Sequence, residues 1–400
     1  MHYIFDRAEK IAAAYGRADV PLVVNLSYGI SGGPHDGSGL IGAAFDELIA
    51  ERRTRAATAL IMPAGNLFQD GLHASITDSH FTPNGTTRAA SLTWRAPPAD
   101  RTSSFIELWY PPGTIPAQIK VSLTPPRGIA SDPSLTIGPG AGRRDMLVAG
   151  RIVGQLQIDR YRGRRWRVTI ILAPSDPRSL PPAPHGGLPA GYWTITLHRP
   201  ASPALSGAID CRIQRDTSYG QGNTGAQQSC FVDPGYDRYA ADGALAQSDS
   251  SDPAVKIRRF GGLNGLADGA TALIVSGYVA STAAAARYGS AGPAAPTPPL
   301  ANHVTLSAMT DRAPFHPGVR SAGTRSGVTI AQRGTSSAAP QVARELARCL
   351  LTGAPPGPTT DNYLALLGAS PDCTPVTLPG PGPKGQDRLG QFRLSPPPQA

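Results

Sequence analysis

The sequence predicts an α/β fold in which a parallel sheet with flanking helices is interrupted by an inserted antiparallel β-sandwich. Two continuous apolar runs, at residues 21–29 and 59–66, flank an amphipathic segment, as in a right-handed strand–helix–strand unit. Residues 86–215 instead contain short segments with period-two alternation between Pro- and Gly-rich turns, which is typical of antiparallel sheets. A further apolar run at 270–279 resumes the first pattern, so we expect the sandwich to be an insertion.

The composition is that of a globular protein with many loops. The chain has 400 residues, of which 45 are glycine and 41 are proline, and charged residues make up 16%. This length allows two to three domains, and the 40% hydrophobic content excludes a disordered chain. No apolar stretch is long enough for a membrane-spanning helix, so no membrane span is expected. We expect no signal peptide in this chain either.

The first part of the α/β core is expected at residues 1–84. Apolar residues at helical spacing predict a helix near residues 4–15 that ends at Gly16, and a second helix near residues 41–49 that Ser38 caps. The two apolar runs are the first strands of the sheet. Ligands of parallel sheets bind beyond the carboxyl ends of the strands, so these strand ends are candidate binding positions.

The inserted β-sandwich is expected at residues 85–215 and is of jelly-roll type. In one of its strands Trp193, Ile195 and Leu197 alternate with polar residues, which predicts one buried and one exposed face. The sequence leaves the role of the insert open. It is either a structural or substrate-orienting element, or a module that binds carbohydrate or protein.

A basic run, RYRGRRWR at residues 160–167, contributes strongly to the net charge of +9. Interleaved basic and aromatic residues are typical of nucleic-acid contacts. A solvated hairpin turn between two strands gives the same pattern, and no nucleic-acid-binding motif accompanies this run. We therefore favour the hairpin and expect no nucleic acid as a partner.

Residues 216–255 are expected to form a connector rich in Gly, Ser and Asp, and residues 356–400 a Pro- and Gly-rich tail. The connector motif VDPGYD places Asp233 and Asp237 on a loop, as turn residues or as ligands of a structural calcium ion. No other cofactor or metal is expected, because the four cysteines lack CxxC spacing. Four unpaired thiols are one alternative for them. The other is a pair of local disulfides, Cys211–Cys230 and Cys349–Cys373.

The second part of the core is expected at residues 256–355 and contains the segment GTSSAAP. This segment indicates a tight glycine turn followed by a helix that begins near Ala339, with Pro340 in its first turn. Ser336 would then lie beside the free N–H groups of a helix N-terminus, which favour a developing negative charge. That arrangement suits acyl transfer with Ser336 as the nucleophile.

GTSSAAP and the helix after it resemble the nucleophile motif of the subtilisin-like serine peptidases, the subtilases. NLSYG at 25–29 is similar to the subtilase strand that lines the substrate cleft, and PAGN at 63–66 to the strand end with the oxyanion-hole asparagine. RYGSAGP at 287–293 looks like the segment that follows a core strand. The motifs occur in the family's order, and the resemblance covers the C-terminal two-thirds of a subtilase catalytic domain, with an insert and a tail.

The resemblance implies a serine-type endopeptidase that cleaves a polypeptide substrate through an acyl-enzyme. It assigns Ser336 as the nucleophile and the Asn66 side chain as an oxyanion donor, with the Ser336 N–H as the second donor. It also implies an exported protein, because subtilases of this type are mostly exported. The substrate-binding positions that it implies are Ser27, Tyr28, Gly29 and Gly65.

The catalytic aspartate and histidine motifs of the family are absent from this sequence. None of the eight histidines lies in a Gly-His-Gly-Thr-His type motif. His35, beside Asp36 on a loop, is the candidate for a replacement base. Two interpretations stay open: a truncated peptidase whose missing N-terminal segment supplies the Asp and His, or a catalytically inactive protein that binds peptides on the same fold.

Overall fold

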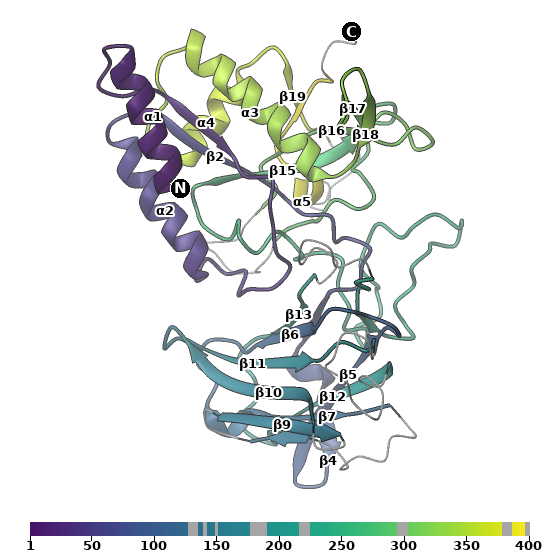
Figure 1. Ribbon diagram of the computed structural model, residues 1–400. Helices are drawn as coiled ribbons and strands as arrows, with labels where there is room; N and C mark the ends of the chain where they lie inside the picture. Colours follow the sequence, from purple (N-terminus) through teal and green to yellow (C-terminus); the bar gives the residue numbers. More distant parts are fainter. Residues whose placement is uncertain are drawn as a thin grey trace. The chain divides into compact units, whose positions relative to one another are not determined.

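The computed structural model describes residues 1–126, 135–138, 142–148, 151–176, 190–215, 225–293, 303–377 and 386–396. The chain forms two compact units, Met1–Gln69 together with Phe260–Ala400, and Asp70–Arg259 (Figure 1). The first unit is therefore built from two separate stretches of sequence. The second unit contains the residues expected to form the inserted sandwich and the connector.

A six-stranded sheet forms the centre of the first unit (Figure 1). Its strands pair in parallel except β19, which pairs antiparallel with β20. The three apolar runs of the sequence lie in β1, β2 and β15, and β2 is buried along its whole length. In order across the sheet the strands are β1 (Leu22–Asn25), β2 (Thr58–Pro63), β15 (Ala272–Val279), β16 (Leu306–Asp311), β20 (Phe392–Leu394) and β19 (Cys373–Pro375).

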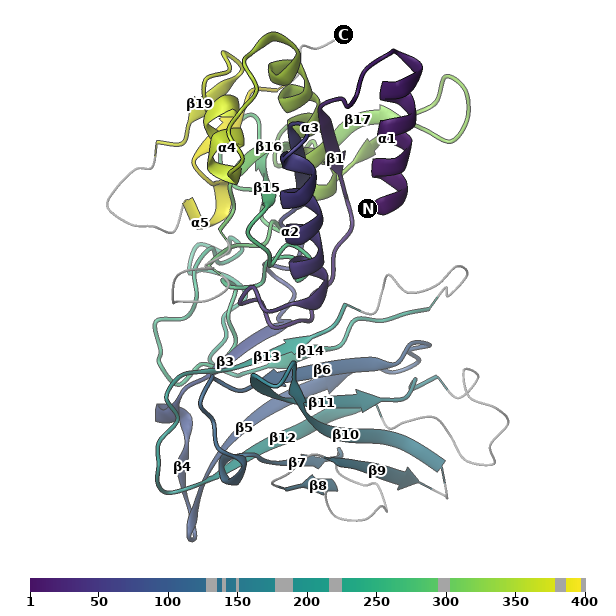
Figure 2. The same ribbon diagram turned by 90° about the vertical axis from the view of Figure 1, so that its left-hand side faces the viewer.

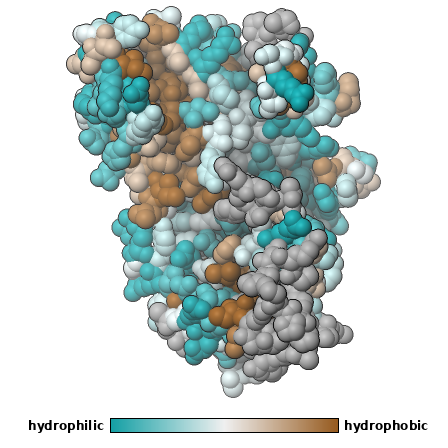
Figure 3. Space-filling model, viewed as in Figure 1, coloured by the Kyte–Doolittle hydropathy of each residue, from teal (hydrophilic) through white to brown (hydrophobic). Residues whose placement is uncertain are grey.

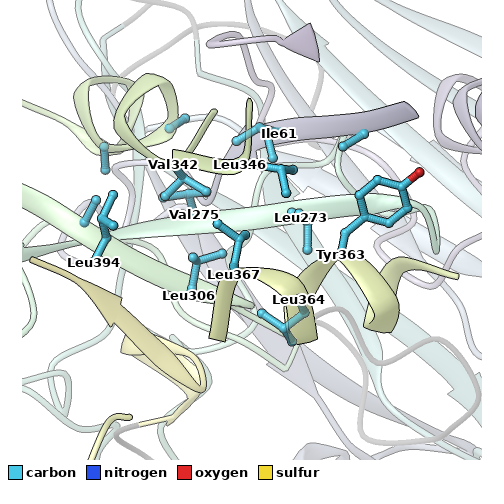
Figure 4. Close-up of a cluster of buried hydrophobic side chains, with 14 of the residues drawn as sticks. Ile61, Leu273, Val275, Leu306, Val342, Leu346, Tyr363, Leu364, Leu367 and Leu394 are labelled. Carbon is cyan, nitrogen blue, oxygen red and sulfur yellow. The ribbon is translucent and has the colours of Figure 1, made fainter. Parts of the chain in front are cut away.

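Helices cover both faces of this sheet, which explains why β2 is apolar without interruption. Leu60 and Met62 pack on one face in a cluster with α1 and α2. Ala59 and Ile61 point to the other face and pack with α3 and α4, in the cluster that Figure 4 shows. The helices are α1 (His2–Ala14), α2 (Leu40–Arg53), α3 (Thr335–Thr352), α4 (Thr360–Gly368) and α5 (Gln386–Leu389).

The start of α3 differs from the sequence prediction. The helix begins at Thr335 after the N-cap Gly334, whereas the prediction placed its start near Ala339. That prediction was wrong because it assumed that a proline in a helical sequence marks the first turn. Pro340 instead lies inside the helix, where it has no N–H to donate to the carbonyl four residues earlier. Ser336 is consequently the second residue of the helix and not a residue before it.

The other two predicted helix boundaries are close to the observed ones. The first helix ends at Ala14, and Gly16 follows in a left-handed conformation with φ of 66°. The N-cap of α2 is Gly39, so the prediction that Ser38 caps this helix was wrong. The Ser38 hydroxyl bonds the Asp36 carboxylate of its own loop instead.

Two short strands deliver the chain to α3. β17 (Val319–Ala322) and β18 (Thr329–Gln332) form a separate two-stranded antiparallel sheet in the first unit. Neither strand belongs to the six-stranded sheet. Its end is followed within two residues by Gly334, the N-cap of α3.

β1 forms one edge of the six-stranded sheet. In the part of the chain that the structure describes, β1 pairs with β2 and its outer side pairs with no strand. Figure 3 shows hydrophobic surface beside α1, next to this edge. Leu22 and Val23 of β1 are only half-buried, so an apolar strand edge reaches the surface.

The second unit contains two antiparallel sheets (Figure 2). One of their strands, β12 (Gly191–Pro200), shows the alternation that the sequence predicted: Trp193, Ile195 and Leu197 are buried, and the residues between them are half-buried. The first sheet is β3 (His73–Ile76), β13 (Ile209–Ile213), β6 (Ser104–Trp109), β11 (Arg165–Leu172), β10 (Arg151–Tyr161) and β9 (Gly142–Val148). The second is β14 (Cys230–Val232), β5 (Thr87–Ala96), β12 (Gly191–Pro200), β7 (Lys120–Thr124) and β8 (Leu135–Ile137), with β4 (Thr82–Asn84) beside β5. Short 3-10 helices lie at Asp78–His80 and Pro116–Gln118.

The basic run forms the turn of the β10–β11 hairpin, as the favoured interpretation predicted. Tyr161 pairs with Arg165 across the turn. Two of its arginines have structural partners within the sheet: Arg165 is buried and donates to the carbonyl of Tyr110, and Arg167 pairs with Asp159 at 2.7 Å. These two arginines of the run therefore have structural roles in the second unit.

Candidate active site

The ends of β1 and β2 and the start of α3 meet at one end of the six-stranded sheet in the first unit. The carboxyl ends of β1 and β2 lie at the same end of the sheet because the two strands are parallel and adjacent. The N-terminal turn of α3 contacts both ends. The Ser27 hydroxyl after β1 donates to the Ser336 carbonyl oxygen at 3.1 Å, and the Thr335 N–H donates to Asn66 Oδ1 after β2 at 2.9 Å. The structure thus brings Ser27, Asn66 and Ser336 together.

The contact between Ser27 and Ser336 follows from the position of Pro340. A helical carbonyl normally accepts from the N–H four residues later, and for Ser336 that residue is Pro340, which has no N–H. The Ser336 carbonyl oxygen is therefore left open, and the Ser27 hydroxyl occupies it. Asn25 in turn donates to the Ser27 hydroxyl at 3.0 Å, so the end of β1 holds this hydroxyl in place.

Asn66 is fixed by the first residue of α3. Its Oδ1 accepts from both the N–H and the hydroxyl of Thr335, and the Gly65 N–H donates to the same hydroxyl at 3.1 Å. Gly334 has a φ of 117°, and a Cβ added there would lie 3.0 Å from Asn66 Nδ2, so both backbone and space require glycine. Thr335, which the sequence analysis did not single out, thus aligns Asn66 with the turn.

Two N–H donors at this turn have no acceptor in the described part of the chain. Asn66 uses its oxygen toward Thr335, which leaves its Nδ2 group without a partner. The Ser336 N–H belongs to the first turn of α3, where backbone donors have no partner within the helix. A carbonyl oxygen that gains negative charge at this position would find two donors and the positive end of a helix dipole.

The RYGSAGP segment packs directly behind PAGN. The Ser290 N–H donates to the Gly65 carbonyl at 2.9 Å, and the Ser290 hydroxyl accepts from the Leu67 N–H at 3.1 Å. Gly65 has a φ of 104°, and a Cβ added there would lie 2.9 Å from the Ser290 hydroxyl. Gly65 is therefore held in a conformation that suits glycine, and its neighbour Asn66 is presented by this loop.

A buried hydroxyl and an ion pair support the glycine turn from beneath. The Tyr288 hydroxyl accepts from the Gly334 N–H at 3.0 Å and donates to the Asp311 carboxylate at 2.8 Å. Arg333 donates to the same carboxylate at 3.0 Å. Burial raises the pKa of Tyr288 to about 12, so its hydroxyl stays neutral and able to donate. The sequence analysis missed these residues, although Tyr288 lies within a motif that it quoted.

Tyr28 and Gly29 follow β1 as an exposed segment, and the Tyr28 side chain is 55% exposed. Asn264, which is 2% exposed, donates to the Tyr28 carbonyl oxygen at 2.9 Å. Asn264 lies in none of the motifs quoted above. Its role had no signal in the sequence because it arises from contacts between segments that are more than 200 residues apart.

The Ser336 hydroxyl is half-buried and has no hydrogen-bond partner in the described residues. His35 does not approach it as a base. His35 is 1% exposed, and its Nε2 lies 3.2 Å from the Ser31 carbonyl oxygen and 3.1 Å from that of Gly32. The ring is thus buried against the carbonyl groups of its own loop. His185 lies outside the described residues.

One of the two candidate calcium ligands, Asp233, makes structural contacts. In the second unit the Asp233 carboxylate accepts from the N–H groups of Gly235 and Lys256, as a turn residue does. The described residues contain no group of three or more His, Cys, Asp or Glu side chains that could hold a metal ion. All four cysteines are free thiols, so the structure has the unpaired alternative and not the two disulfides.

The structure is similar to that of the CspB protease of Clostridium perfringens, with a TM-score of 0.62 and 16% sequence identity over 98% of this chain and 68% of that chain. No protein-family model matches the chain, and no curated protein matches it. The chain therefore shares the fold of a protease, and its mixture of parallel and antiparallel sheets is compatible with a subtilase-like fold. No helix among the described residues is long and apolar enough to span a membrane.

Proposed function

We propose that this chain carries the nucleophile half of a subtilisin-like serine endopeptidase. The observation that carries the proposal is the pair of unpartnered donors, the Ser336 N–H and Asn66 Nδ2, beside the Ser336 hydroxyl at the start of α3. Many helix starts satisfy such donors with a capping side chain, and this one has no side-chain cap in the described chain. The arrangement of the two donors instead suits a ligand atom that accepts two hydrogen bonds.

In this mechanism the Ser336 oxygen attacks the scissile carbonyl carbon of a polypeptide while its proton passes to a base. The carbonyl oxygen becomes an oxyanion that accepts from the Ser336 N–H and Asn66 Nδ2. The C–N bond then breaks, the amine leaves with a proton, and an ester to Ser336 remains. Water hydrolyses this ester and restores the hydroxyl. Each oxyanion donor of this kind contributes about 10²- to 10³-fold in rate.

The base is proposed to come from a further polypeptide segment that supplies the Asp–His pair. In subtilisin, loss of the histidine alone lowers kcat on the order of 10⁶-fold, so this chain by itself is expected to be very slow. The outer side of β1 supports the proposal, because it pairs with no strand in the described part of the chain and borders a hydrophobic surface. A strand that docks there would extend the sheet on the side where Ser27 lies.

The substrate backbone is proposed to bind as an extended strand along Ser27, Tyr28 and Gly29, with Gly65 on the other side of the reacting carbonyl. We further propose that the two antiparallel sheets of the second unit form an inserted sandwich of jelly-roll type that orients the substrate. Export from the cell belongs to the same proposal, since it follows only from the resemblance to exported peptidases.

A catalytically inactive, peptide-binding protein is the second candidate. The observation that favours it is the Ser336 hydroxyl, which has no base among the described residues. Such a protein would still need the exposed segment after β1, because an extended peptide pairs with backbone groups. It would not need the two donors at the start of α3.

A fluorophosphonate probe separates the two candidates. We expect slow labelling of the purified chain that Ser336→Ala abolishes and that Ser337→Ala, one residue further along the same helix turn, leaves unchanged. Binding of fluorescein-labelled β-casein, an unfolded polypeptide, is measured in parallel by anisotropy. Casein binding without labelling would favour the inactive binding protein, and the absence of both would contradict both candidates.

A further inference from the structure

Asn264 is a buried side chain that uses all of its hydrogen-bonding groups on two strand ends and its own loop. Its Nδ2 group donates to the carbonyl oxygens of Tyr28, at 2.9 Å, and Pro63, at 3.1 Å. Its Oδ1 accepts from the N–H groups of Ile30, at 3.2 Å, and Leu266, at 3.0 Å. This side chain therefore ties the segment after β1 to the end of β2.

These contacts pair the backbone groups of Tyr28 and Ile30 and leave those of Gly29 open. The Tyr28 carbonyl oxygen and the Ile30 N–H both point toward Asn264, and the Ile30 carbonyl oxygen accepts from the Gly265 N–H at 2.8 Å. The Tyr28 N–H donates to the carbonyl of Leu26. In an extended chain successive residues direct their backbone groups to opposite sides. Gly29, between them, is exposed, and its N–H and carbonyl have no partner in the described chain.

The Asn264 side chain also explains why residue 29 is a glycine. A Cβ added to Gly29 would lie 2.7 Å from both Cγ and Oδ1 of Asn264, closer than Cβ atoms of folded proteins approach non-bonded atoms. The φ of Gly29 lies outside the left-handed region, so its backbone conformation does not demand glycine. The glycine is therefore required by the Asn264 side chain and not by a turn.

We propose that Asn264 is a positioning residue that sets the register of a bound polypeptide. It occupies the inward backbone groups of Tyr28 and Ile30, while both the N–H and the carbonyl of Gly29 between them stay open. An extended polypeptide then forms its pair of backbone hydrogen bonds at Gly29. The inference rests on the proposed binding of polypeptides, but it holds for a peptidase and for an inactive peptide binder alike.

The first test measures casein binding and Ser336 labelling in Asn264→Ala. We expect the affinity for fluorescein-labelled β-casein to fall by about tenfold or more, because the Tyr28 carbonyl and the Ile30 N–H lose their partner and the segment loses its fixed register. The labelling rate with a small fluorophosphonate, which does not span this segment, should stay within about twofold. Asn362→Ala, at the start of α4, is the control for removing a hydrogen-bonded asparagine elsewhere. Unchanged casein affinity in Asn264→Ala would overturn the proposal.

A double-variant cycle tests the contact without relying on one substitution. Gly29→Ala alone is expected to weaken casein binding, because its methyl group meets Asn264. In the Asn264→Ala background the same change should cost nothing further, since the obstructing atoms are gone. Costs for Gly29→Ala that are equal in both backgrounds would show that Asn264 does not control this position.

Hydrogen exchange tests the positioning role of Asn264 independently of the proposed function. In the unliganded protein the Ile30 N–H is expected to be protected and the Gly29 N–H to exchange freely, and Asn264→Ala should remove the protection at Ile30. If the chain binds no casein and takes no label, the proposed function fails, while this pattern still supports the positioning role. Equal exchange at Ile30 with and without Asn264 would overturn the positioning role even if casein binds.

Discussion

The two ends of α3 both carry polar groups, but they differ in how these groups are paired. Near its C-terminal end the Glu345 carboxylate accepts from two nitrogens of Arg348 and from the Ser370 hydroxyl. The Arg348 contact, followed by the other hydrogen bonds, holds the pKa of Glu345 below its usual value. At the N-terminal end the Ser336 N–H, the Ser336 hydroxyl and Asn66 Nδ2 have no partner in the described chain.

This difference separates a structural cluster from a candidate site. A buried polar group without a partner costs about 1 to 3 kcal/mol, so structural clusters satisfy their own members. The donors at the N-terminal end of α3 belong to half-buried residues, so they can stay unpaired at little cost and remain open to an acceptor that a ligand supplies. The N-terminal end of α3 has this character, and each of the following changes tests the distinction.

Asn66→Asp is expected to have the largest effect. The variant keeps Oδ1, which accepts from the Thr335 N–H, and replaces the Nδ2 donor with an oxygen. Under the proposed function the fluorophosphonate labelling rate of Ser336 should fall by about 10²- to 10³-fold, with little change in the midpoint of thermal unfolding. Asn362→Asp is the matched control, because Asn362 Oδ1 accepts from the Thr359 N–H in the same way. Equal labelling rates in the two variants would contradict the donor role.

Asp268 is a buried group in the first unit whose Oδ1 has no partner, and it lies outside the candidate site. The pKa of its carboxyl is raised to about 6, mainly by burial and also by the nearby carboxylates of Asp36 and Asp46, while the hydrogen bond from the Gly39 N–H opposes the shift. The folded protein thus binds a proton that the unfolded chain releases between pH 4 and 6. The free energy of unfolding should therefore increase as pH falls through this range, on the order of 3 kcal/mol.

Urea unfolding between pH 4 and 7 checks this sign. Asp268→Asn should flatten the pH dependence, and Asp361→Asn, an exposed residue at the start of α4, should leave it in place. A pH dependence that Asp268→Asn does not alter would show that an unpaired buried carboxylate is not its source. The result shows whether the folded protein keeps the unpaired Asp268 carboxyl by protonating it.

Glu345→Ala tests the paired end of α3. We expect the free energy of unfolding to fall by about 2 kcal/mol, because Ser370 and Arg348 lose their acceptor, while the Ser336 labelling rate stays within about twofold. Since the folded-state pKa of Glu345 is lowered, its contribution is present above the unfolded pKa and is lost as pH falls through the folded value. Glu47→Ala, on the exposed face of α2, is the control. A changed labelling rate in Glu345→Ala would mean that the two ends are coupled.

Ser27→Ala is expected to have the smallest effect. It removes the donor to the Ser336 carbonyl oxygen and should lower the free energy of unfolding by about 1 kcal/mol or less, because Ser27 is exposed. In a Pro340→Ala background the new N–H at residue 340 can bond this carbonyl, so Ser27→Ala should then cost almost nothing. A cost that does not depend on residue 340 would show that the proline does not create the need for Ser27.

Three strands of the first unit, β1, β2 and β15, could be predicted from the sequence because their apolar runs are uninterrupted, whereas β19 and β20 lie in the residues expected to form a tail. β2 and β15 are buried between two layers of helices, and this double burial makes such runs recognisable, whereas β1 at the edge of the sheet is only half-buried. The start of α3 was mispredicted by four residues, because Pro340 was interpreted as a first-turn residue. A proline inside a helix is tolerated here since the carbonyl that it leaves open finds Ser27.

The candidate site could be predicted only where a motif marks it. Ser336 and Asn66 belong to quoted motifs, and the structure brings their segments into contact, while their catalytic roles stay predictions. Asn264 and Asp311 gave no signal, because their importance comes from hydrogen bonds to distant backbone groups. The burial of His35 was equally invisible, since it depends on how its own loop closes around the ring.

The open side of β1 also has a consequence for how this protein behaves in solution. Unpaired backbone groups on an apolar strand edge are a template for any other strand, including the same edge of a second molecule. At high concentration we expect this chain to self-associate edge to edge, and the association should compete with a strand that docks there. The solubility of the protein should therefore increase when a strand covers this edge.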